Sequence, residues 1–129
     1  MGEQLFQVLL GACLAAGISY LANRFLIKYW GNWSIGLLVP GVEEIAKTGL
    51  GILLNTSIWG IHILFGVIEA LYDGFTGGET RWAAVVASLL GHCFFGFIAT
   101  SLVSRSMGMA IMVPWLVHGA WNYLTLLLR

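Results

Sequence analysis

Charge is what this sequence has least of. Of 129 residues, six are Lys or Arg and six are Asp or Glu, so 9% are charged and the formal net charge is zero. The basic residues are scattered, so no basic stripe indicates a nucleic-acid surface. No run of like charges indicates a disordered tail. We therefore expect no nucleic-acid partner.

Cysteine and proline are also scarce, with two of each. Cys13 and Cys93 fall inside apolar segments, where a small buried hydrophobic side chain is expected rather than a disulfide or a metal ligand. Pro40 and Pro114 also lie in apolar segments, where a proline removes a backbone hydrogen bond and favours a kink. Gly41 next to Pro40 would let another backbone or a substrate come close.

Apolar residues are what the chain has in abundance. They make up 59% of it, and the mean hydropathy is +0.88. These values are typical of an integral membrane protein. The fold class we predict is all-α: a polytopic transmembrane helical bundle of about five transmembrane helices in one domain, residues 1–129. The expected helices cover about residues 5–21, 33–54, 58–72, 82–103 and 109–128.

Short polar segments separate these helices. Asn55–Ser57 and Ser104–Ser106 are expected to be tight turns. Asp73–Arg81 is glycine-rich and is expected to be a mobile loop. Lys28–Trp33 combines basic and aromatic residues, which favours an interfacial loop.

The basic residues also give an orientation. In a five-helix topology Arg24, Lys28, Arg81 and Arg129 fall on one side of the membrane and Arg105 on the other. The excess of positive charge in cytoplasmic loops then predicts an outer N-terminus and a cytoplasmic C-terminus.

Three ionisable side chains interrupt the apolar segment 33–54. Glu43 and Lys47 are four residues apart and Glu44 and Lys47 three apart, so on a helix one ammonium can reach either carboxylate. Burying a charged side chain in the middle of a membrane costs roughly 3 kcal/mol or more, unless the group pairs with an opposite charge, loses its charge or faces water. A functional role is therefore expected, with a structural ion pair as the alternative.

Polar residues of other helices are expected at similar depths. Measured from the expected cytoplasmic ends at about 1.5 Å per residue, Glu43, His92 and His118 lie about 15 Å deep, Asn122 about 10 Å and Glu69 about 6 Å. We therefore predict one site built from several helices. The alternative for Glu69 is that it lies at the membrane boundary outside the site. The alternative for His92 is a structural role in helix packing.

His118 and Asn122 are four residues apart on one helix face. Together they offer hydrogen-bond donors of the kind that stabilise a carbonyl oxygen as it gains charge. A His–Asn pair joining two helices is the alternative. His62 lies towards the other end of its helix and is expected to be a packing or boundary residue.

Four separated motifs together resemble the PrsW-type branch of the CAAX-protease and bacteriocin-processing superfamily of intramembrane proteases. In chain order they are Glu43-Glu44-x-x-Lys47, Phe65-x-x-x-Glu69, His92 and His118-x-x-x-Asn122. The resemblance implies hydrolysis of a peptide bond within or at the edge of the membrane. It implies that Glu43 activates water and that Glu44 and Lys47 orient or balance it.

The same resemblance implies that His118 and Asn122 hold the oxyanion, while Glu69 and His92 position the water or a proton. The wider superfamily often has Arg one position beyond Lys47 and His in place of Glu69, so the PrsW-type branch fits better than the prenyl-protein proteases. Members are commonly longer. A homo-oligomer or a membrane partner is therefore an expected way to enclose the substrate.

The acidic and imidazole side chains also include ligand types that suit zinc: Glu43, Glu44, Glu69, His92 and His118. No HExxH or comparable short spacing is present, so a glutamate-activated water is preferred and zinc is kept as the alternative.

The function we predict is an intramembrane endopeptidase acting on a membrane-anchored or hydrophobic peptide. We expect the protein to be embedded in a lipid bilayer. The resemblance alone implies that this bilayer is a prokaryotic plasma membrane. Two other functions remain open. One is a non-catalytic membrane scaffold of the same fold, and the other is a proton or ion pathway.

Overall fold

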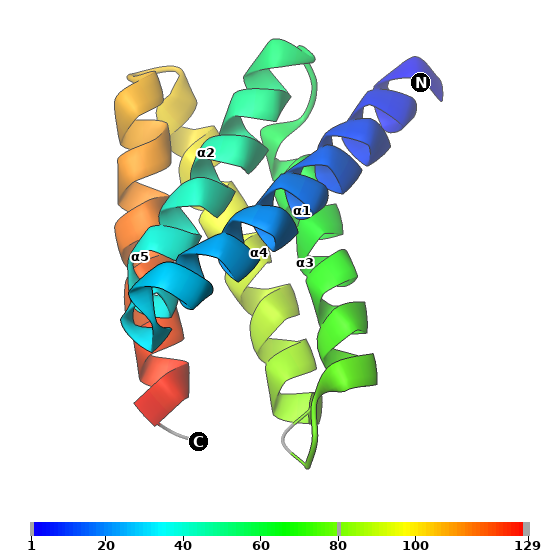
Figure 1. Cartoon of the computed structure of the whole chain (residues 1–129). Helices are drawn as coiled ribbons and strands as arrows, with labels where there is room; N and C mark the ends of the chain where they lie inside the picture. Colours follow the sequence, from blue (N-terminus) through cyan, green and yellow to red (C-terminus); the bar gives the residue numbers. More distant parts are fainter. Residues whose placement is uncertain (1, 80, 128–129) are drawn as a thin grey trace.

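The computed structural model describes residues 2–79 and 81–127, and this part of the chain forms five α-helices and one short 3-10 helix, with no strand (Figure 1). The elements are α1 (Gly2–Trp30), η1 (Asn32–Gly36), α2 (Leu38–Leu53), α3 (Ile58–Thr76), α4 (Arg81–Val103) and α5 (Met107–Leu127). The prediction of an all-α fold is confirmed.

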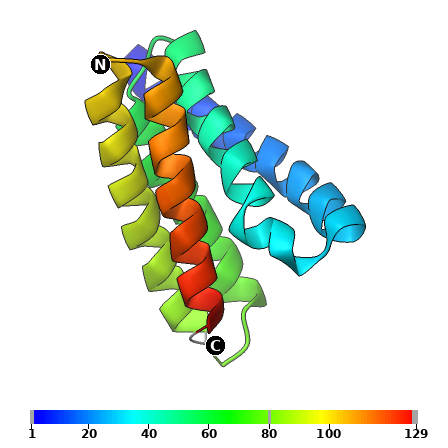
Figure 2. The same cartoon turned by 90° about the vertical axis from the view of Figure 1, so that its left-hand side faces the viewer.

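The helices are arranged as a bundle crossed by the first helix. α3, α4 and α5 run side by side in alternating directions, α2 packs against α5 and α3, and α1 crosses α2 and α3 obliquely (Figure 1). After a quarter turn, α1 runs obliquely away from α4 and α5, and η1 leads the chain back to α5, against which it packs (Figure 2).

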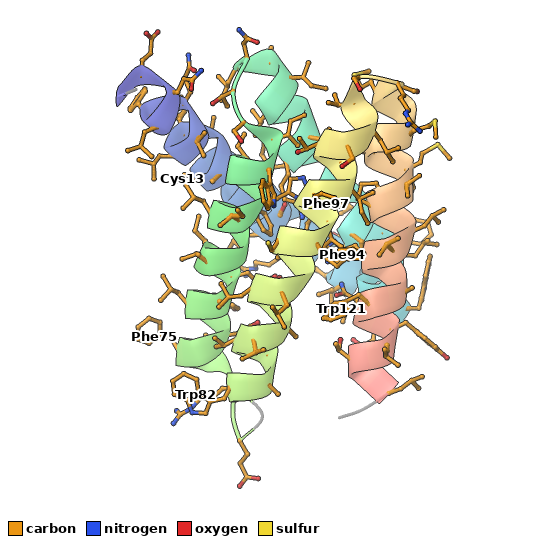
Figure 3. All side chains as sticks on the ribbon, turned by 180° about the vertical axis from the view of Figure 1, so that it is seen from behind. Cys13, Phe75, Trp82, Phe94, Phe97 and Trp121 are labelled. Carbon is orange, nitrogen blue, oxygen red and sulfur yellow. The ribbon has the colours of Figure 1, made fainter. Side chains whose placement is uncertain are left out.

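Three of the helices in the described residues are long and apolar enough to cross a membrane: α1, α3 and α4. Large apolar side chains are exposed on the outside of the bundle, as Phe94 and Phe97 are on α4 (Figure 3). The side chains buried inside it include three charged ones, Glu43, Glu44 and Lys47, and all three histidines. This distribution is the reverse of that in water-soluble proteins and fits a membrane-embedded protein. A membrane crossing by α2 and α5 stays a prediction.

The second helix begins later than predicted. Trp33 lies in η1, and α2 starts only at Leu38, so α2 has 16 residues instead of about 22. Pro40 therefore lies in the first turn of α2, where its missing N–H costs no helical hydrogen bond. The predicted kink at Pro40 is wrong for this reason. Gly41 does permit a close approach, because a Cβ there would lie 2.7 Å from the Trp115 ring.

Two predicted loops are partly helical. α1 continues through Lys28 to Trp30 and ends at Gly31, whose φ of 71° favours glycine. α3 continues to Thr76, so the first four residues of the predicted 73–81 loop form a helical turn. The tight turns at 55–57 and 104–106 are confirmed, and Ser57 caps α3 by accepting a hydrogen bond from the Gly60 N–H.

A reciprocal contact brings α3 and α4 unusually close. Each helix carries a histidine followed four residues later by a glycine: His62 and Gly66 on α3, and His92 and Gly96 on α4. A Cβ at Gly66 would lie 2.8 Å from Cβ of His92, and one at Gly96 would lie 2.6 Å from Cβ of His62. Each histidine thus occupies space that the facing glycine leaves open, which holds both imidazoles inside the bundle.

Neither cysteine is bonded to another. Both are free; Cys93 is half-buried, and Cys13 is exposed on α1 (Figure 3). The prediction that Cys13 is buried is wrong, because it lies on the outer face of α1. The inner face of that helix consists of Gly11, Ala12, Ala15 and Ser19, whose small side chains allow α1 to pack closely.

Gly96→Ala is expected to destabilise the protein although alanine is the better helix former. The added methyl group meets His62, and overpacking of this kind costs about 1–3 kcal/mol. Gly17→Ala on α1 is the matched control, since a Cβ there meets nothing within 4 Å. Thermal unfolding in detergent, followed by tryptophan fluorescence, measures both. An unchanged Tm for Gly96→Ala would contradict the close α3–α4 contact.

Candidate active site

A fully buried ammonium group lies at the centre of the bundle. Lys47 Nζ is 2.7 Å from Glu44 Oε1 and 2.9 Å from His92 Nδ1, and the Phe65 ring centroid is 4.5 Å away. Neither Lys47 nor Glu44 is exposed. A buried cation is stable only with compensating partners, and here a carboxylate, an imidazole lone pair and an aromatic face supply them.

The ammonium fixes the orientation of His92. Lys47 can only donate, so His92 Nδ1 accepts and a neutral ring carries its hydrogen on Nε2. That nitrogen lies 2.6 Å from Glu69 Oε2, to which it donates. α3 continues past Glu69 to Thr76, and the half-buried Glu69 pairs with the buried His92. The place of Glu69 relative to the membrane boundary stays a prediction.

The second imidazole is oriented through the same carboxylate. His118 Nδ1 lies 2.9 Å from Glu44 Oε1 and donates to it. The Phe95 ring stacks on His118 at a centroid distance of 4.5 Å. His118 Nε2 then points to Glu43, with 3.8 Å between Nε2 and Glu43 Oε2. This distance is too long for a direct hydrogen bond.

Glu43 has one satisfied oxygen and one open oxygen. The Asn23 amide donates to Glu43 Oε1 at 3.2 Å. Glu43 Oε2 is buried and has no hydrogen-bond partner among the described residues. It lies 3.9 Å from Lys47 Nζ, which is close enough for an ion pair.

These groups form two layers around a cavity of about 380 Å³. Glu43, Glu69, His92 and His118 line the cavity, whereas Glu44, Lys47 and His62 lie behind them. The cavity lies between the end of α1, η1 and the start of α2 on one side and α3, α4 and α5 on the other. Trp121, between α4 and α5 in Figure 3, forms part of its wall. The outer layer can meet a ligand, and the inner layer can only orient the outer one.

The structure brings together six of the seven residues that the sequence predicts for the site. Glu43, Glu44, Lys47, Glu69, His92 and His118 form one network of hydrogen bonds and ion pairs. Asn122, the seventh, lines the same cavity as His118, but its amide donates to Ile35 O at 3.2 Å and, among the described residues, forms no hydrogen bond with the network.

Two members of the network were not predicted. His62 was expected to be a packing or boundary residue, yet it is fully buried with Nε2 3.8 Å from Glu44 Oε2 and 3.5 Å from Thr48 Oγ1. Asn23 lies just past the first helix predicted for residues 5–21 and is not among the predicted site residues. Because α1 continues past it and crosses α2, its amide reaches Glu43. Both His62 and Asn23 are polar residues within apolar helices, and this feature of the sequence could have identified them as members of the site.

Glu43, His92 and His118 also have the composition of a two-histidine, one-carboxylate zinc site, and one ligand atom from each lies within 4.8 Å of the others. The arrangement does not fit the ion. Both ring nitrogens of His92 are already bonded, one to the Lys47 ammonium and the other to Glu69. A metal would have to displace one of these bonds and would stand beside a fixed positive charge. The second cluster, Glu44, His62 and His92, includes the same imidazole.

Comparisons of the chain with protein-family models, with curated proteins and with solved structures find no match. The chemistry of the site must therefore be argued from its own geometry.

Lys47→Met is expected to destabilise the protein strongly. It leaves the Glu44 carboxylate buried without its cation, which costs about 3–5 kcal/mol. Adding Glu44→Gln to Lys47→Met should recover part of this loss, because the unpaired charge is removed. Thermal unfolding of the purified variants measures the effect.

Lys28→Met is the matched control, since Lys28 is exposed near the end of α1. Equal and small shifts in Tm for Lys28→Met and Lys47→Met would show that the buried network does not depend on the ammonium.

Proposed function

We propose that this protein is a membrane-embedded endopeptidase that hydrolyses a peptide bond in a membrane-anchored or hydrophobic peptide. The observation that carries the proposal is the 3.8 Å gap between Glu43 Oε2 and His118 Nε2 at the cavity wall. A water oxygen can lie within about 2.8 Å of both atoms in such a gap. Glu43 Oε2 has no hydrogen-bond partner among the described residues, so it can accept a hydrogen bond from that water.

In the proposed reaction the water attacks the carbonyl carbon of the substrate. Glu43 accepts a proton from the water as the new C–O bond forms, which makes it the general base. When the C–N bond breaks, Glu43 returns the proton to the leaving amine. His118, whose Nδ1–H is held by Glu44, keeps its Nε2 directed at the water and so orients the lone pair for attack.

The developing oxyanion needs donors on the cavity wall. The Asn122 side chain lies on this wall and its amide has two N–H bonds, of which Ile35 O accepts one. We assign it the role of donor to the oxyanion. Glu44 and Lys47 act as positioning residues, because both lie behind the cavity wall and contact only the residues that line it.

The resemblance to the PrsW-type proteases supports a hydrolytic site with Glu43 as the base. It differs in the role of His118, which it assigns to the oxyanion, whereas the Nδ1 hydrogen of His118 is already donated to Glu44. The motif residues come from α2, α3, α4 and α5, and all lie in or next to one cavity.

With the resemblance we propose that α2 and α5 also lie within the bilayer, that the N-terminus is outside and that the membrane is a prokaryotic plasma membrane. In this orientation Arg81 begins α4 on the proposed cytoplasmic side and Arg105 follows the opposite end of α4; Arg129 lies outside the described residues.

A proton pathway is the second candidate, and one observation favours it. Hydrogen bonds of 2.9 Å or less connect five side chains without a gap: Glu69, His92, Lys47, Glu44 and His118. Such a chain can pass protons across part of a membrane. It predicts a proton flux in liposomes and no peptide product.

Glu43→Gln is expected to abolish peptide cleavage while the protein stays folded, because the amide cannot accept the proton from water. His118→Ala should lower turnover by about a hundredfold, because the attacking water loses the group that orients it. Purified protein is incubated with a diverse set of membrane-anchored peptides, and products are identified by mass spectrometry. Cleavage by both variants at the parent's rate would refute the proposed site.

Treatment with a zinc chelator is expected to leave turnover unchanged, because His92 has no ring nitrogen to offer a metal. Turnover is measured before and after chelation and dialysis, with metal content determined on the same samples. Loss of activity that zinc restores would replace the glutamate mechanism by a zinc mechanism.

A further inference from the structure

Glu43, the proposed general base, lies between two groups that can bond its carboxylate. The Asn23 amide donates to Oε1 at 3.2 Å, while Oε2 has no hydrogen-bond partner among the described residues. Lys47 Nζ lies 3.9 Å from Oε2. An ammonium has three N–H bonds, and Glu44 and His92 accept two of those of Lys47, so one remains. Asn23 and Lys47 therefore compete for the same carboxylate.

The outcome of this competition decides whether Glu43 can act as a base. Oε2 faces His118 Nε2 across the 3.8 Å gap proposed to hold the attacking water. The i,i+4 spacing of Glu43 and Lys47 on one helix would also permit a direct bond between Oε2 and the ammonium. Such a bond would occupy the lone pair that must take the proton from water. The hydrogen bond at Oε1 keeps Oε2 directed at the gap instead.

Close packing of α1 on α2 brings the Asn23 amide to Glu43. α1 crosses α2 (Figure 1), and two turns before Asn23 the fully buried Ala15 lies in one apolar cluster with Ala46 of α2. Ala46 in turn lies about one turn after Glu43. The four motifs come from α2, α3, α4 and α5, so Asn23 is the residue by which α1 reaches the network.

The Asn23 amide has only one of its polar atoms bonded. A carboxylate can only accept hydrogen bonds, so the amide nitrogen is the atom that faces Glu43. The amide oxygen is buried and has no hydrogen-bond partner among the described residues. A buried acceptor without a partner destabilises a fold, and an apolar side chain would avoid this cost if Asn23 only joined two helices. The cost therefore indicates a role at Glu43.

We infer that Asn23 is a positioning residue for the general base: its amide holds Oε1 of Glu43, so that Oε2 stays directed at the His118 gap instead of pairing with Lys47. α1, which carries none of the motif residues, is then part of the active site. The catalytic part of this inference rests on the proposed function, whereas the bond between Asn23 and Glu43 does not.

Asn23→Leu is expected to lower kcat about tenfold, the scale of one hydrogen bond to a charged group, because the substitution keeps the size of the side chain but removes the donor. KM should stay within about twofold, since Asn23 bonds Glu43 and not the substrate. Asn23→Ala removes the same donor without adding apolar bulk and should give the same result. Both constants are measured with a membrane-anchored peptide that the parent protein cleaves.

Two variants are matched controls. Ser19→Ala changes the same face of α1 one turn earlier, where the buried serine hydroxyl has no hydrogen-bond partner among the described residues. Asn32→Leu makes the same change as Asn23→Leu at an exposed position. Both controls should keep kcat within about twofold of the parent value, as for substitutions that remove no bond.

Infrared spectroscopy tests the bond itself without requiring cleavage. In each background, subtracting the spectrum of the protein that also carries Glu43→Gln isolates the carboxyl vibrations of Glu43, whose frequencies depend on its hydrogen bonds. These bands are expected to shift in Asn23→Leu and in Asn23→Ala, and to stay in place in Ser19→Ala. Thermal unfolding shows that each variant is folded.

The inference is overturned if the bands do not shift, if they shift while kcat is unchanged, or if KM rises instead of kcat falling, which would indicate a contact with the substrate. A loss of kcat in Ser19→Ala as large as in Asn23→Leu would indicate an effect of α1 packing and would overturn it as well.

Failure of the proposed function gives a different result. A band shift in a protein that cleaves no peptide would support the bond but refute the peptidase, and with it the catalytic role of Asn23. Cleavage that does not depend on Asn23 would support the peptidase and refute the positioning role.

Discussion

The contact between Lys47 and Glu44, buried between four helices, is the interaction on which the rest of the site depends. A cation and an anion inside an apolar bundle are tolerable only when each has further partners. Lys47 therefore also bonds His92, and Glu44 also bonds His118. One ion pair thus determines which nitrogen of each imidazole carries hydrogen, and with it what the cavity can accept or donate.

The close approach of α3 and α4 makes this arrangement possible. The glycines at 66 and 96 leave space for the two histidines of the facing helices, so both imidazoles point inward instead of into lipid. The cavity lies on the side of the bundle where the end of α1, η1 and the start of α2 face α3, α4 and α5. The inner layer is therefore enclosed, whereas the outer layer lines the cavity, where a ligand can reach it.

Much of the site could be predicted from single residues, because charge in an apolar helix is costly and therefore informative. Glu43, Glu44 and Lys47 are conspicuous on that ground alone, and depth along the helices brought His92 and His118 to them. The estimate of depth along the helices did not identify Asn23. That estimate assumes that every helix is perpendicular to the membrane, whereas α1 crosses the other helices obliquely.

Helix boundaries were predicted less well than helices. The apolar run from Trp33 to Leu54 contains no signal for the 3-10 turn before α2, since hydropathy does not distinguish it from an α-helix. Likewise the glycines after Asp73 suggested a loop, although the packing of α3 on α4 keeps Asp73–Thr76 helical. Tertiary contacts decided both boundaries.

Hydrolysis requires that water reach the cavity, and this can be measured directly. In a chain whose native cysteines are replaced, Ala87→Cys lies on the cavity wall and Leu90→Cys, one turn along α4, lies on the exposed apolar face. Both proteins are reconstituted in liposomes and treated with a water-soluble maleimide. Rapid labelling at position 87 and slow labelling at position 90 are expected. Equal protection of both cysteines would mean that the carboxylates are sealed from water, which would contradict a hydrolytic site.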